Sequence, residues 1–481
     1  MKRAAPLLLI ASLAGTLGAC SLQPKYVRPL PAVPAGWRIA DPALLASETD
    51  LASLSYRAIF REPRLQALIG RSLDHSQNLK AALANVTAAR ALYRVQRAAL
   101  LPAINGSAAA SVSESGNGNA GVNGGATSGG QRENYSVNLG ASAFELDLFG
   151  RLRSLSDAQL NAYLATEQAA RATRLTLAAD IADAYFTLAA DRSLLAIAKQ
   201  TAASAQRSVA LTSARLKGGI APRTDLRQAE TIEATARSDV ANLTTIVEQD
   251  RNALELLIGG PVTDADLPGA IESVDDQVGP VPVGISSSIL LRRPDVVEAE
   301  YQLRAANARI GAARAAFFPR ISLTSVGGLA SSALSGLFTG GAFAYNAGAS
   351  ASVPIFAGGA NSGNLAAARA QAEAATATYQ RAIQLAFRDV SDALARRATI
   401  ADQIAAQTAL EAAARDTAFL TGERYRGGVA SFLESLDAQR ALYASERSLI
   451  NARLLRASNM VALYRALGGD DFSGARPASQ P

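Results

Sequence analysis

Four short segments of the chain alternate between polar residues and apolar or small residues. In residues 135–143, with the sequence YSVNLGASA, the odd positions are apolar or small and the even positions are mostly polar. Residues 343–353 keep the same parity, and in residues 104–113 the even positions are the apolar or small ones. A period of two indicates a β-strand whose two faces meet different surroundings. The pattern predicts strands at about 103–114, 134–147, 320–331 and 342–355.

Glycine-rich loops separate the alternating segments, and one of them fills residues 114–134. Alternating segments of about ten residues with such loops between them are typical of a transmembrane β-barrel. A half-buried sheet in a soluble domain produces the same alternation, so the pattern leaves both interpretations open. If the strands span lipid, four of them cannot close a barrel, because known barrels begin at about eight strands and an open edge leaves backbone groups unpaired. Several copies of the chain would then have to pool their strands.

Long helices are expected over most of the remaining sequence. Hydrophobic residues make up 49% of the chain but aromatic residues only 5%, and the apolar fraction is largely alanine, a strong helix former. A first helix at about 64–100 should end where Pro102 follows. Glycine pairs then separate two long helices in each half, at about 152–217 and 224–257, and at about 361–426 and 432–467. A 60-residue helix is about 90 Å long, a length that suits a coiled coil or a tube.

The order of these elements occurs twice because the sequence repeats itself. Residues 215–230 (RLKGGIAPRTDLRQAE) align without a gap with residues 424–439 (RYRGGVASFLESLDAQ). An earlier pair of segments aligns Pro102 with Pro319. The alignment predicts two tandem copies, at 61–260 and 285–470, joined by a linker at 261–284 and followed by a tail at 471–481.

The N-terminus has the pattern of an export signal. A basic pair precedes an apolar stretch, from about residue 7 to residue 17, that is too short to span a bilayer. The stretch ends in LGAC at 17–20, which resembles the lipobox of bacterial lipoproteins. It predicts a signal peptide at 1–19 and a lipidated extended segment at 20–60, with a diacylglycerol and an N-acyl chain such as palmitate on Cys20. The alternative is an ordinary secretory signal followed by an incidental cysteine.

Cys20 is the only cysteine, so no intrachain disulfide can form. Ser21 after it, rather than an aspartate, fits sorting to the outer membrane. No run of 18 apolar residues follows the signal, so the sequence predicts no transmembrane helix after it. The net charge of +6 is spread over interspersed charges without a nucleic-acid motif, so we expect no nucleic-acid partner.

An enzymatic function has little support in the sequence. His75 is the only histidine and lies among polar residues, which favours a surface or capping role over catalysis. Hydrolase, phosphate-loop and metal-ligand motifs are absent from the sequence. We therefore expect no catalytic residue, no metal site and no cofactor other than the lipid on Cys20.

Several motifs occur in a fixed order: the lipobox, FELDLFGR at 144–151, LRRPD at 291–295, PIFAGG at 354–359 and the paired Gly-Gly turns. In this order the chain resembles the outer-membrane factor family, the exit ducts of tripartite efflux pumps and type I secretion systems. It most closely resembles the NodT-type lipoprotein branch that serves resistance-nodulation-division (RND) efflux. The resemblance implies a mainly α-helical fold with β-strands. In it, a homotrimer builds a twelve-stranded outer-membrane β-barrel that a helical tunnel continues across the periplasm.

The resemblance also implies a constriction at the turns between the long helices. These turns contain the glycine pairs Gly218-Gly219 and Gly427-Gly428. By motif position, Glu434 and Asp437 fall where the constricting carboxylates of the family lie. Three residues fall where family members link neighbouring helix pairs, namely Thr224, Asp225 and Tyr425.

Two departures from the family pattern affect this implied latch. Ala430 stands where better-known members carry an arginine, and one constricting carboxylate is glutamate rather than aspartate. The latch is then weaker, or it uses another base such as Arg223, Arg424 or Arg426. Three copies of the two acidic residues would form a ring that attracts cations. A solvated helix N-terminus also favours acidic residues, so this simpler interpretation stays open.

The function implied by the resemblance is a passive exit duct for drugs or other toxic small molecules across the periplasm and the outer membrane. Its expected partners are a periplasmic membrane-fusion adaptor, an inner-membrane RND pump, two further copies of the chain and outer-membrane lipid. One alternative is the duct of a type I protein secretion system. Another is a structural coiled-coil lipoprotein of the cell envelope, which leaves the four alternating segments unexplained.

Overall fold

The computed structural model describes residues 21–34, 36–37, 55–114, 131–279 and 287–469. The predicted signal peptide, Cys20 and the C-terminal tail lie outside the described residues. The chain divides into two compact units. We call residues 1–29, 86–166 and 299–379 the strand unit, and residues 30–85, 167–298 and 380–481 the helical unit. The helices α4, α5, α8 and α9 contribute residues to both units.

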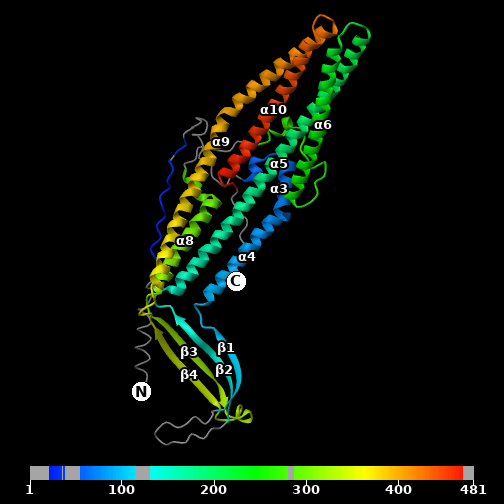
Figure 1. Ribbon diagram of the computed structural model, residues 1–481. Helices are drawn as coiled ribbons and strands as arrows, with labels where there is room; N and C mark the ends of the chain where they lie inside the picture. Colours follow the sequence, from blue (N-terminus) through cyan, green and yellow to red (C-terminus); the bar gives the residue numbers. More distant parts are fainter. Residues whose placement is uncertain (1–20, 35, 38–54, 115–130, 280–286, 470–481) are drawn as a thin grey trace. The chain divides into compact units, whose positions relative to one another are not determined.

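Six helices of more than twenty residues dominate the chain (Figure 1). They are α4 (Gln77–Ala98), α5 (Arg151–Lys217), α6 (Arg223–Ile258), α8 (Pro294–Ala315), α9 (Ala360–Arg426) and α10 (Phe432–Ala466). Shorter helices are α2 (Tyr56–Ile59), α3 (Pro63–His75), α7 (Ile271–Val274) and the 3-10 turns η3 (Ser287–Arg292) and η4 (Leu334–Gly336). Both α5 and α9 contain 67 residues, and the four long helices lie within about one residue of the ranges expected from the sequence. No helix in the described part of the chain combines the length and apolar character needed to cross a membrane.

The expected first helix at 64–100 is wrong as a continuous element, because it is divided into α3 and α4 at Ser76. Ser76 adopts an extended ψ of 125°, and its N–H still donates to the carbonyl of Ser72 at 2.8 Å. Its hydroxyl oxygen accepts from the backbone N–H of Leu79 at 3.5 Å. Serine satisfies the unpaired N–H groups at a helix start in this way, so the second helix begins here.

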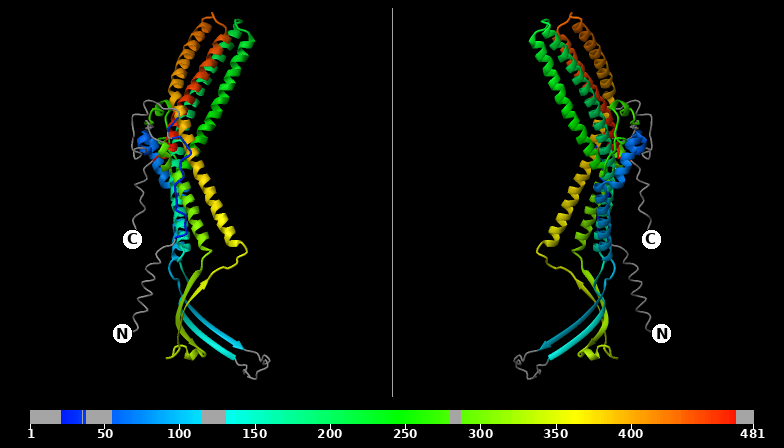
Figure 2. Two further views of the ribbon diagram at one scale, coloured as in Figure 1. Left: turned by 90° about the vertical axis from the view of Figure 1, so that its left-hand side faces the viewer. Right: turned by 90° about the vertical axis from the view of Figure 1, so that its right-hand side faces the viewer.

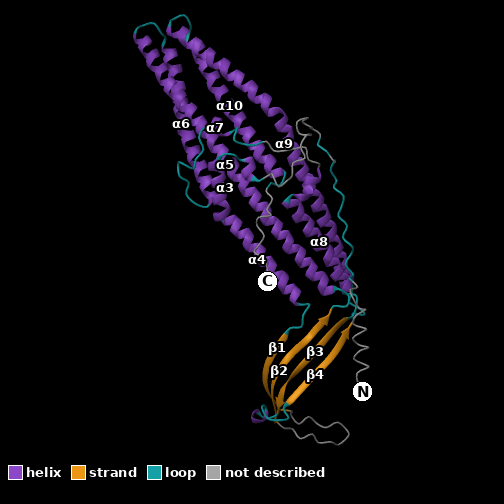
Figure 3. Cartoon of the chain, turned by 180° about the vertical axis from the view of Figure 1, so that it is seen from behind, coloured by secondary structure: helices purple, strands orange, loops and turns teal. Residues whose placement is uncertain are grey.

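The strand unit contains an antiparallel sheet in the order β1-β2-β3-β4 (Figure 3). The strands are β1 (Ile104–Glu114), β2 (Gln131–Leu146), β3 (Arg320–Ser331) and β4 (Phe343–Ser352). Within the described residues, β1 pairs only with β2 and β4 pairs only with β3. Both outer strands therefore present a row of backbone N–H and C=O groups without a neighbouring strand.

The two faces of the sheet differ in chemistry. One face carries mostly apolar and small side chains, including the cross-strand pairs Ala108–Val137 and Leu329–Phe343. The other face carries mostly polar and small side chains, including the pairs Ser107–Asn138 and Ser322–Ser350. Every residue of β1 and β4 is exposed in the single chain. Large apolar side chains on the apolar face are 63% exposed at Leu139 and 78% exposed at Tyr345.

A β-bulge in β2 preserves this division of faces. The register shifts between Ala141 and Phe144, so that two residues of β2 face one residue of β3. Ala143 has φ +58° and its N–H donates to the hydroxyl of Thr324 at 3.3 Å. Beyond the bulge the apolar positions change from odd to even numbers, which keeps Phe144 and Leu146 on the apolar face.

The FELDLFGR motif forms the turn from β2 into α5. The two carboxylate oxygens of Asp147 accept hydrogen bonds from the backbone N–H groups of Leu152 at 3.0 Å and Arg153 at 2.8 Å. These bonds satisfy donors that a helix start leaves unpaired. Arg151 binds Glu145 through two hydrogen bonds of 2.8 and 2.7 Å. The motif therefore fixes the direction in which α5 leaves the sheet.

Residues 21–29, here called the N-terminal strap, lie along α8 within the strand unit. The Arg28 guanidinium donates two hydrogen bonds, of 3.0 and 2.8 Å, to the Glu300 carboxylate. The Tyr26 hydroxyl donates to the same carboxylate at 3.2 Å. The other end of the strap is held where Arg314 donates to the carbonyl of Leu22 at 3.2 Å. A Cβ at Gly311 would lie 2.8 Å from the Cα of Gln23, so only glycine lets the strap approach α8 this closely.

The expected linker is tied to several helices of the helical unit, over the part of it that the structure describes. Asp275 accepts from Arg456 of α10 at 2.6 Å, and its side chain is only 2% exposed. Asp266 accepts from Arg71 of α3 at 3.0 Å, and the carbonyl of Pro268 accepts from Arg192 of α5 at 2.6 Å. These contacts join α3, α5 and α10 through the linker, in a unit that also contains three of the largest fully buried side chains, Phe60, Tyr185 and Tyr464.

Candidate functional site

The helical unit contains two long hairpins, α5–α6 and α9–α10, whose turns lie side by side at the same end (Figure 2). Both turns have the same hydrogen bonds. Ile220 N–H donates to the Arg215 carbonyl and Val429 N–H donates to the Arg424 carbonyl, each at 3.0 Å. Gly219 and Gly428 complete the pattern by donating to carbonyls three residues earlier. This is the Schellman ending of a helix, in which the penultimate position takes a left-handed conformation.

The two glycines of each pair have different roles. Gly219 has φ +74° and Gly428 has φ +77°, values that side chains other than glycine adopt at a cost. Gly218 and Gly427 have no positive φ, and a Cβ built on either would come no closer than 3.5 Å to its neighbours. The backbone therefore requires glycine only at the second position of each pair.

Glu434 lies in the first turn of α10, directly after the second hairpin turn. The hydroxyl of Ser431, the N-cap residue, accepts from the Glu434 N–H at 3.3 Å. The Glu434 carboxylate accepts from Arg424 of α9 at 3.1 Å, with both side chains about half exposed. Arg424 was one of three bases expected to substitute for an arginine at position 430, and it pairs with the acidic residue across the turn. The second candidate, Arg426, pairs with Glu423 at 2.5 Å, and the third, Arg223, is exposed at the start of α6.

Asp437 is exposed one helical turn after Glu434. Residues three apart lie on one side of a helix, so the two carboxylates share an exposed face of α10. Groups of three or more His, Cys, Asp or Glu that could hold a metal ion do not occur among the described residues.

The expected linking residues do not all lie together. Thr224 is exposed and Asp225 is partly buried in the first turn of α6, where an acidic residue interacts favourably with the helix dipole. Tyr425 of α9 is 6% exposed and contacts α5 instead. Its hydroxyl lies 3.4 Å from that of Thr212, and the Arg215 guanidinium lies 4.4 Å from the ring centroid.

An apolar cluster below the turns holds the two hairpins together. Its buried members are Ala229 of α6, Tyr425 of α9, and Phe432 and Leu436 of α10. Partly buried Val209, Leu211 and Ile232 pack against them. Arg215 adds a hydrogen bond of 2.9 Å to the carbonyl of Arg426. In the single chain, this apolar cluster and the polar contacts beside it therefore link the two hairpins.

Sequence reasoning did not identify Thr212 and Arg215 as part of this linkage. The internal repeat contained a usable signal, because it aligns Arg215 with Arg424, which lies next to Tyr425. A second missed contact lies further along the hairpins, where Tyr443 donates to Asp239 at 2.9 Å. These two residues are 204 positions apart, and neither belongs to a local motif. His75, the only histidine, is the last residue of α3 and is exposed.

The model of the outer membrane efflux protein family matches the chain at residues 68–260 and 285–469. Curated relatives match along almost their whole length. The probable efflux pump outer membrane protein TtgC of Pseudomonas putida is 40% identical, over 98% of this chain and 97% of its own. The outer membrane protein OprJ of Pseudomonas aeruginosa is 38% identical, over 94% of each chain.

The solved structures that this chain resembles are also those of channels. The open-state MtrE outer membrane channel of Neisseria gonorrhoeae has a TM-score of 0.82 and 35% identity, covering 94% of this chain and 98% of its own. A crystal structure of CusC gives a TM-score of 0.82 and 37% identity, covering 94% of this chain and 100% of its own.

The fold and the matched sequence define an efflux-type outer membrane protein, whose family consists of efflux channels and is not an enzyme family. The chain belongs to the outer membrane efflux protein family, which confirms the resemblance drawn from its motifs.

Proposed function

We propose that the chain is the outer-membrane channel of a tripartite efflux pump, acting as a passive exit duct without catalytic chemistry. Three copies would close their sheets into one twelve-stranded barrel in the outer membrane. The long helices would continue this barrel into the periplasm as a tunnel. Relatives are named for efflux of toluene and of antibiotics, which favours toxic small molecules as the cargo.

The two-faced sheet is the observation that carries the proposal. One face carries mostly apolar side chains and the other mostly polar and small ones, and on both faces every side chain of the outer strands β1 and β4 is exposed in the single chain. A barrel that turns the apolar face to lipid and the polar face to a water-filled channel satisfies both. The polar face is rich in serine and asparagine, which suits an aqueous passage for varied solutes.

The unpaired edges of the sheet support an assembly of several copies. In lipid, each backbone group without a partner costs several kcal/mol. An outer strand of 11 residues, such as β1, directs roughly ten N–H and C=O groups outward. Pairing β1 of one copy with β4 of the next removes this cost from every copy, and three copies bring the strand number above the minimum for a closed barrel.

The hairpin turns are the proposed periplasmic gate. Three copies of Glu434 and Asp437 would place up to six carboxylates around the inner mouth of the tunnel. Cations would be attracted there, and divalent ions would bridge neighbouring copies. The apolar cluster below the turns holds the two hairpins of each copy together. Opening the gate would therefore require the side chains of this cluster to move apart. A periplasmic adaptor that engages the turns, coupled to an inner-membrane pump, would supply the energy for this separation.

Cys20 is the proposed second anchor to the membrane. The N-terminal strap starts immediately after it and lies along α8, and its first residues are held at Leu22 by Arg314, six residues before β3 begins. The strap would therefore bring the lipid chains close to the level at which the strands begin. Several acyl chains anchor a protein stably, whereas one chain binds only marginally.

Disulfide cross-linking between outer strands tests the assembly directly. Ala109→Cys in β1 is combined in turn with Asn346→Cys, Gly348→Cys or Ser350→Cys in β4, and cells are oxidised before denaturing electrophoresis. We expect at least one pair to yield covalent dimers and trimers and no larger species. If none of the three pairs forms a disulfide between two chains, the proposed barrel is wrong.

A matched control places both cysteines within one sheet. Ser136 of β2 and Ala330 of β3 are cross-strand partners, so Ser136→Cys with Ala330→Cys should form a disulfide inside each chain. This variant should migrate as a monomer after denaturation. A ladder from the control would mean that the cross-links report random collisions.

The genes adjacent to this one would distinguish a drug efflux duct from the alternative of a protein secretion duct, because a secretion system has an ATP-driven exporter in place of the proton-coupled pump.

A further inference from the structure

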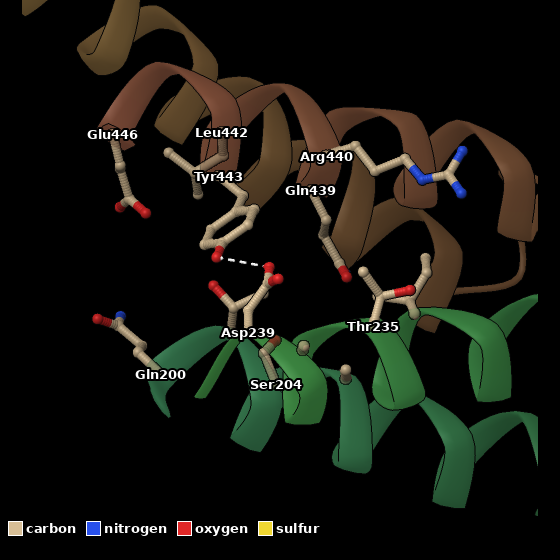
Figure 4. Close-up of a pocket in the computed structure, with 13 residues that line it drawn as sticks. Gln200, Ser204, Thr235, Asp239, Gln439, Arg440, Leu442, Tyr443 and Glu446 are labelled. Atoms are coloured by element: carbon tan, nitrogen blue, oxygen red, sulfur yellow. Dashed lines mark hydrogen bonds between the residues drawn. The ribbon is translucent and has the colours of Figure 1, made fainter. Parts of the chain in front are cut away.

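A cavity of about 200 Å³ lies between α5, α6 and α10 in the helical unit, next to the apolar cluster below the hairpin turns, with which it shares Ile232 (Figure 4). Apolar side chains from all three helices form part of its wall, namely Ala205, Ile232, Ala236 and Leu442. The remaining wall is polar and contains Gln200, Ser204, Thr235 and Gln439. The cavity is thus amphipathic, as are sites that hold small organic molecules.

A hydrogen bond between the two hairpins crosses this cavity. The hydroxyl of Tyr443 on α10 donates to Asp239 Oδ2 on α6 at 2.9 Å. Burial, together with the neighbouring Asp239 carboxylate, raises the pKa of Tyr443 to about 12, so the phenol stays protonated as the donor. A carboxylate has about four lone-pair positions, and this bond uses one. Asp239 therefore retains the capacity to bind a second donor from the cavity.

The charges around the cavity favour a cation. Two carboxylates line it, Asp239 and Glu446, against one guanidinium, Arg440. The Arg440 side chain points away from Asp239 in Figure 4. The Glu446 side chain is 14% exposed and pairs with Arg415 at 3.1 Å. Burial and the neighbouring Glu411 carboxylate raise the pKa of Glu446 against the opposing effect of Arg415.

We propose that this cavity is a binding site for a small, flat organic cation, whose charged group pairs with Asp239 and whose apolar body lies against Ile232, Ala236 and Leu442. An amidinium or guanidinium matches a carboxylate with two parallel hydrogen bonds. A cavity of about 150 Å³ holds one benzene ring, so about 200 Å³ accommodates an aromatic ring carrying such a group. The Tyr443 ring already has the Arg447 guanidinium 5.4 Å from its centroid, so the proposed contact of the cation is with the Asp239 carboxylate.

Bound between α6 and α10, the cation strengthens the contact between the two hairpins. A ligand that binds only the joined arrangement stabilises it by mass action. If the hairpin turns form the proposed gate, organic cations would favour its closed state. This last step rests on the proposed function, whereas binding in the cavity does not.

The test is calorimetric titration of the purified full-length protein with benzamidine, a flat cation, and with benzamide, its neutral counterpart of nearly the same shape. Loss of a charge-assisted pair corresponds to about tenfold or more in affinity. We therefore expect benzamide to bind at least about tenfold more weakly than benzamidine. Asp239→Asn, which keeps an oxygen for Tyr443, should weaken benzamidine by a similar factor.

Two controls locate the binding. Asp402→Asn removes an exposed carboxylate from α9 of the same unit and should leave the affinity unchanged. Glu434→Ala with Asp437→Ala removes the tip carboxylates and should also leave it unchanged, so failure of the gate proposal and failure of this one are distinguishable. Equal binding of benzamidine and benzamide to the unaltered protein overturns the proposal, even if Asp239→Asn does not assemble. Loss of binding only in the tip variant overturns it as well.

Discussion

Glu300 of α8 is the residue whose replacement should release the N-terminal strap. Its side chain is 5% exposed and accepts hydrogen bonds from Arg28, Tyr26 and, within its own helix, Arg304 at 2.6 Å. Burial alone would raise the pKa of Glu300, but hydrogen bonds from Arg28 and Arg304 outweigh it and hold the pKa below the usual value. The carboxylate is therefore ionised at neutral pH and serves as the attachment point of the strap.

Glu300→Gln keeps the shape of the side chain but removes its charge. The amide can accept at one oxygen only, and its NH₂ group faces the donors of Arg28. A hydrogen bond to a charged group contributes about 1.5–3 kcal/mol. Because the Arg28 side chain is 47% exposed, solvent screens part of this contribution. We expect the strap to lose about 2 kcal/mol of attachment, which is roughly a 30-fold rise in its detached population.

Trypsin cleavage of the strap measures this population. The bond after Lys25 is the only susceptible one within residues 21–29, because Pro29 follows Arg28. Cleavage that needs prior detachment proceeds in proportion to the detached population. Mass spectrometry of this single bond should therefore show an initial rate roughly 30-fold higher in Glu300→Gln, by the same factor as the population.

Glu373→Gln is the matched control, since it makes the same chemical change at an exposed position of α9 in the strand unit. Its cleavage rate should equal that of the unaltered protein. An unchanged rate in Glu300→Gln would refute the assignment of this carboxylate as the strap's attachment point. Attachment should persist through the pH range in which glutamate ordinarily titrates and weaken only at lower pH, because a depressed pKa preserves the interaction until the pH falls through the folded value.

Other residues give further expected outcomes. Gly428→Ala should destabilise the hairpin turn by about 1–2 kcal/mol through its positive φ, whereas Gly427→Ala should change the thermal midpoint little. Phe432→Ala should cost about 3–5 kcal/mol locally and speed amide hydrogen exchange at both turns, and unchanged exchange there would show that the apolar cluster does not hold the hairpins. Burial raises the pKa of Asp183 to about 6 against the opposing Arg465, so the folded state takes up a proton below that pH and stability should rise as the pH falls from 7 to 5. Asp183→Asn should flatten this part of a melting-temperature profile, and an unaltered slope would assign it to other groups.

Periodicity and the internal repeat predicted the four long helices within about one residue, because each depends on local signals. Two strand bounds differ more, since β2 begins three residues before 134 and β4 ends three residues before 355. Alternation marked β1 and β3 within about one residue, and Gly-Gly pairs marked both hairpin turns. The break between α3 and α4 escaped prediction because serine also occurs within helices, and only the capping bond to Leu79 distinguishes Ser76. The change of parity after Ala143 was similarly hidden, since a bulge depends on the neighbouring strand.

The site was predicted less completely than the fold. Motif position singled out Glu434 as a constriction residue, which stays a prediction, and its pairing with Arg424 is a contact between residues ten apart. Contacts between hairpins join residues about 200 positions apart, such as Tyr425 with Thr212 and Tyr443 with Asp239. No local pattern specifies such pairs, because they depend on which faces of two long helices meet. The position of the strap also escaped prediction, since the hydrogen bonds from Arg28 to Glu300 join residues 272 positions apart.

Single-channel recording in planar lipid bilayers tests the central claim, that the chain forms a gated duct, most directly. The purified protein should insert as discrete conductance steps of low amplitude, blocked further by divalent cations at the inner mouth. Glu434→Ala with Asp437→Ala should raise the conductance of each step and reduce that block. Unchanged conductance and block in this variant would refute the gate. Absence of discrete steps from both proteins, under conditions in which they insert as trimers, would contradict the duct itself.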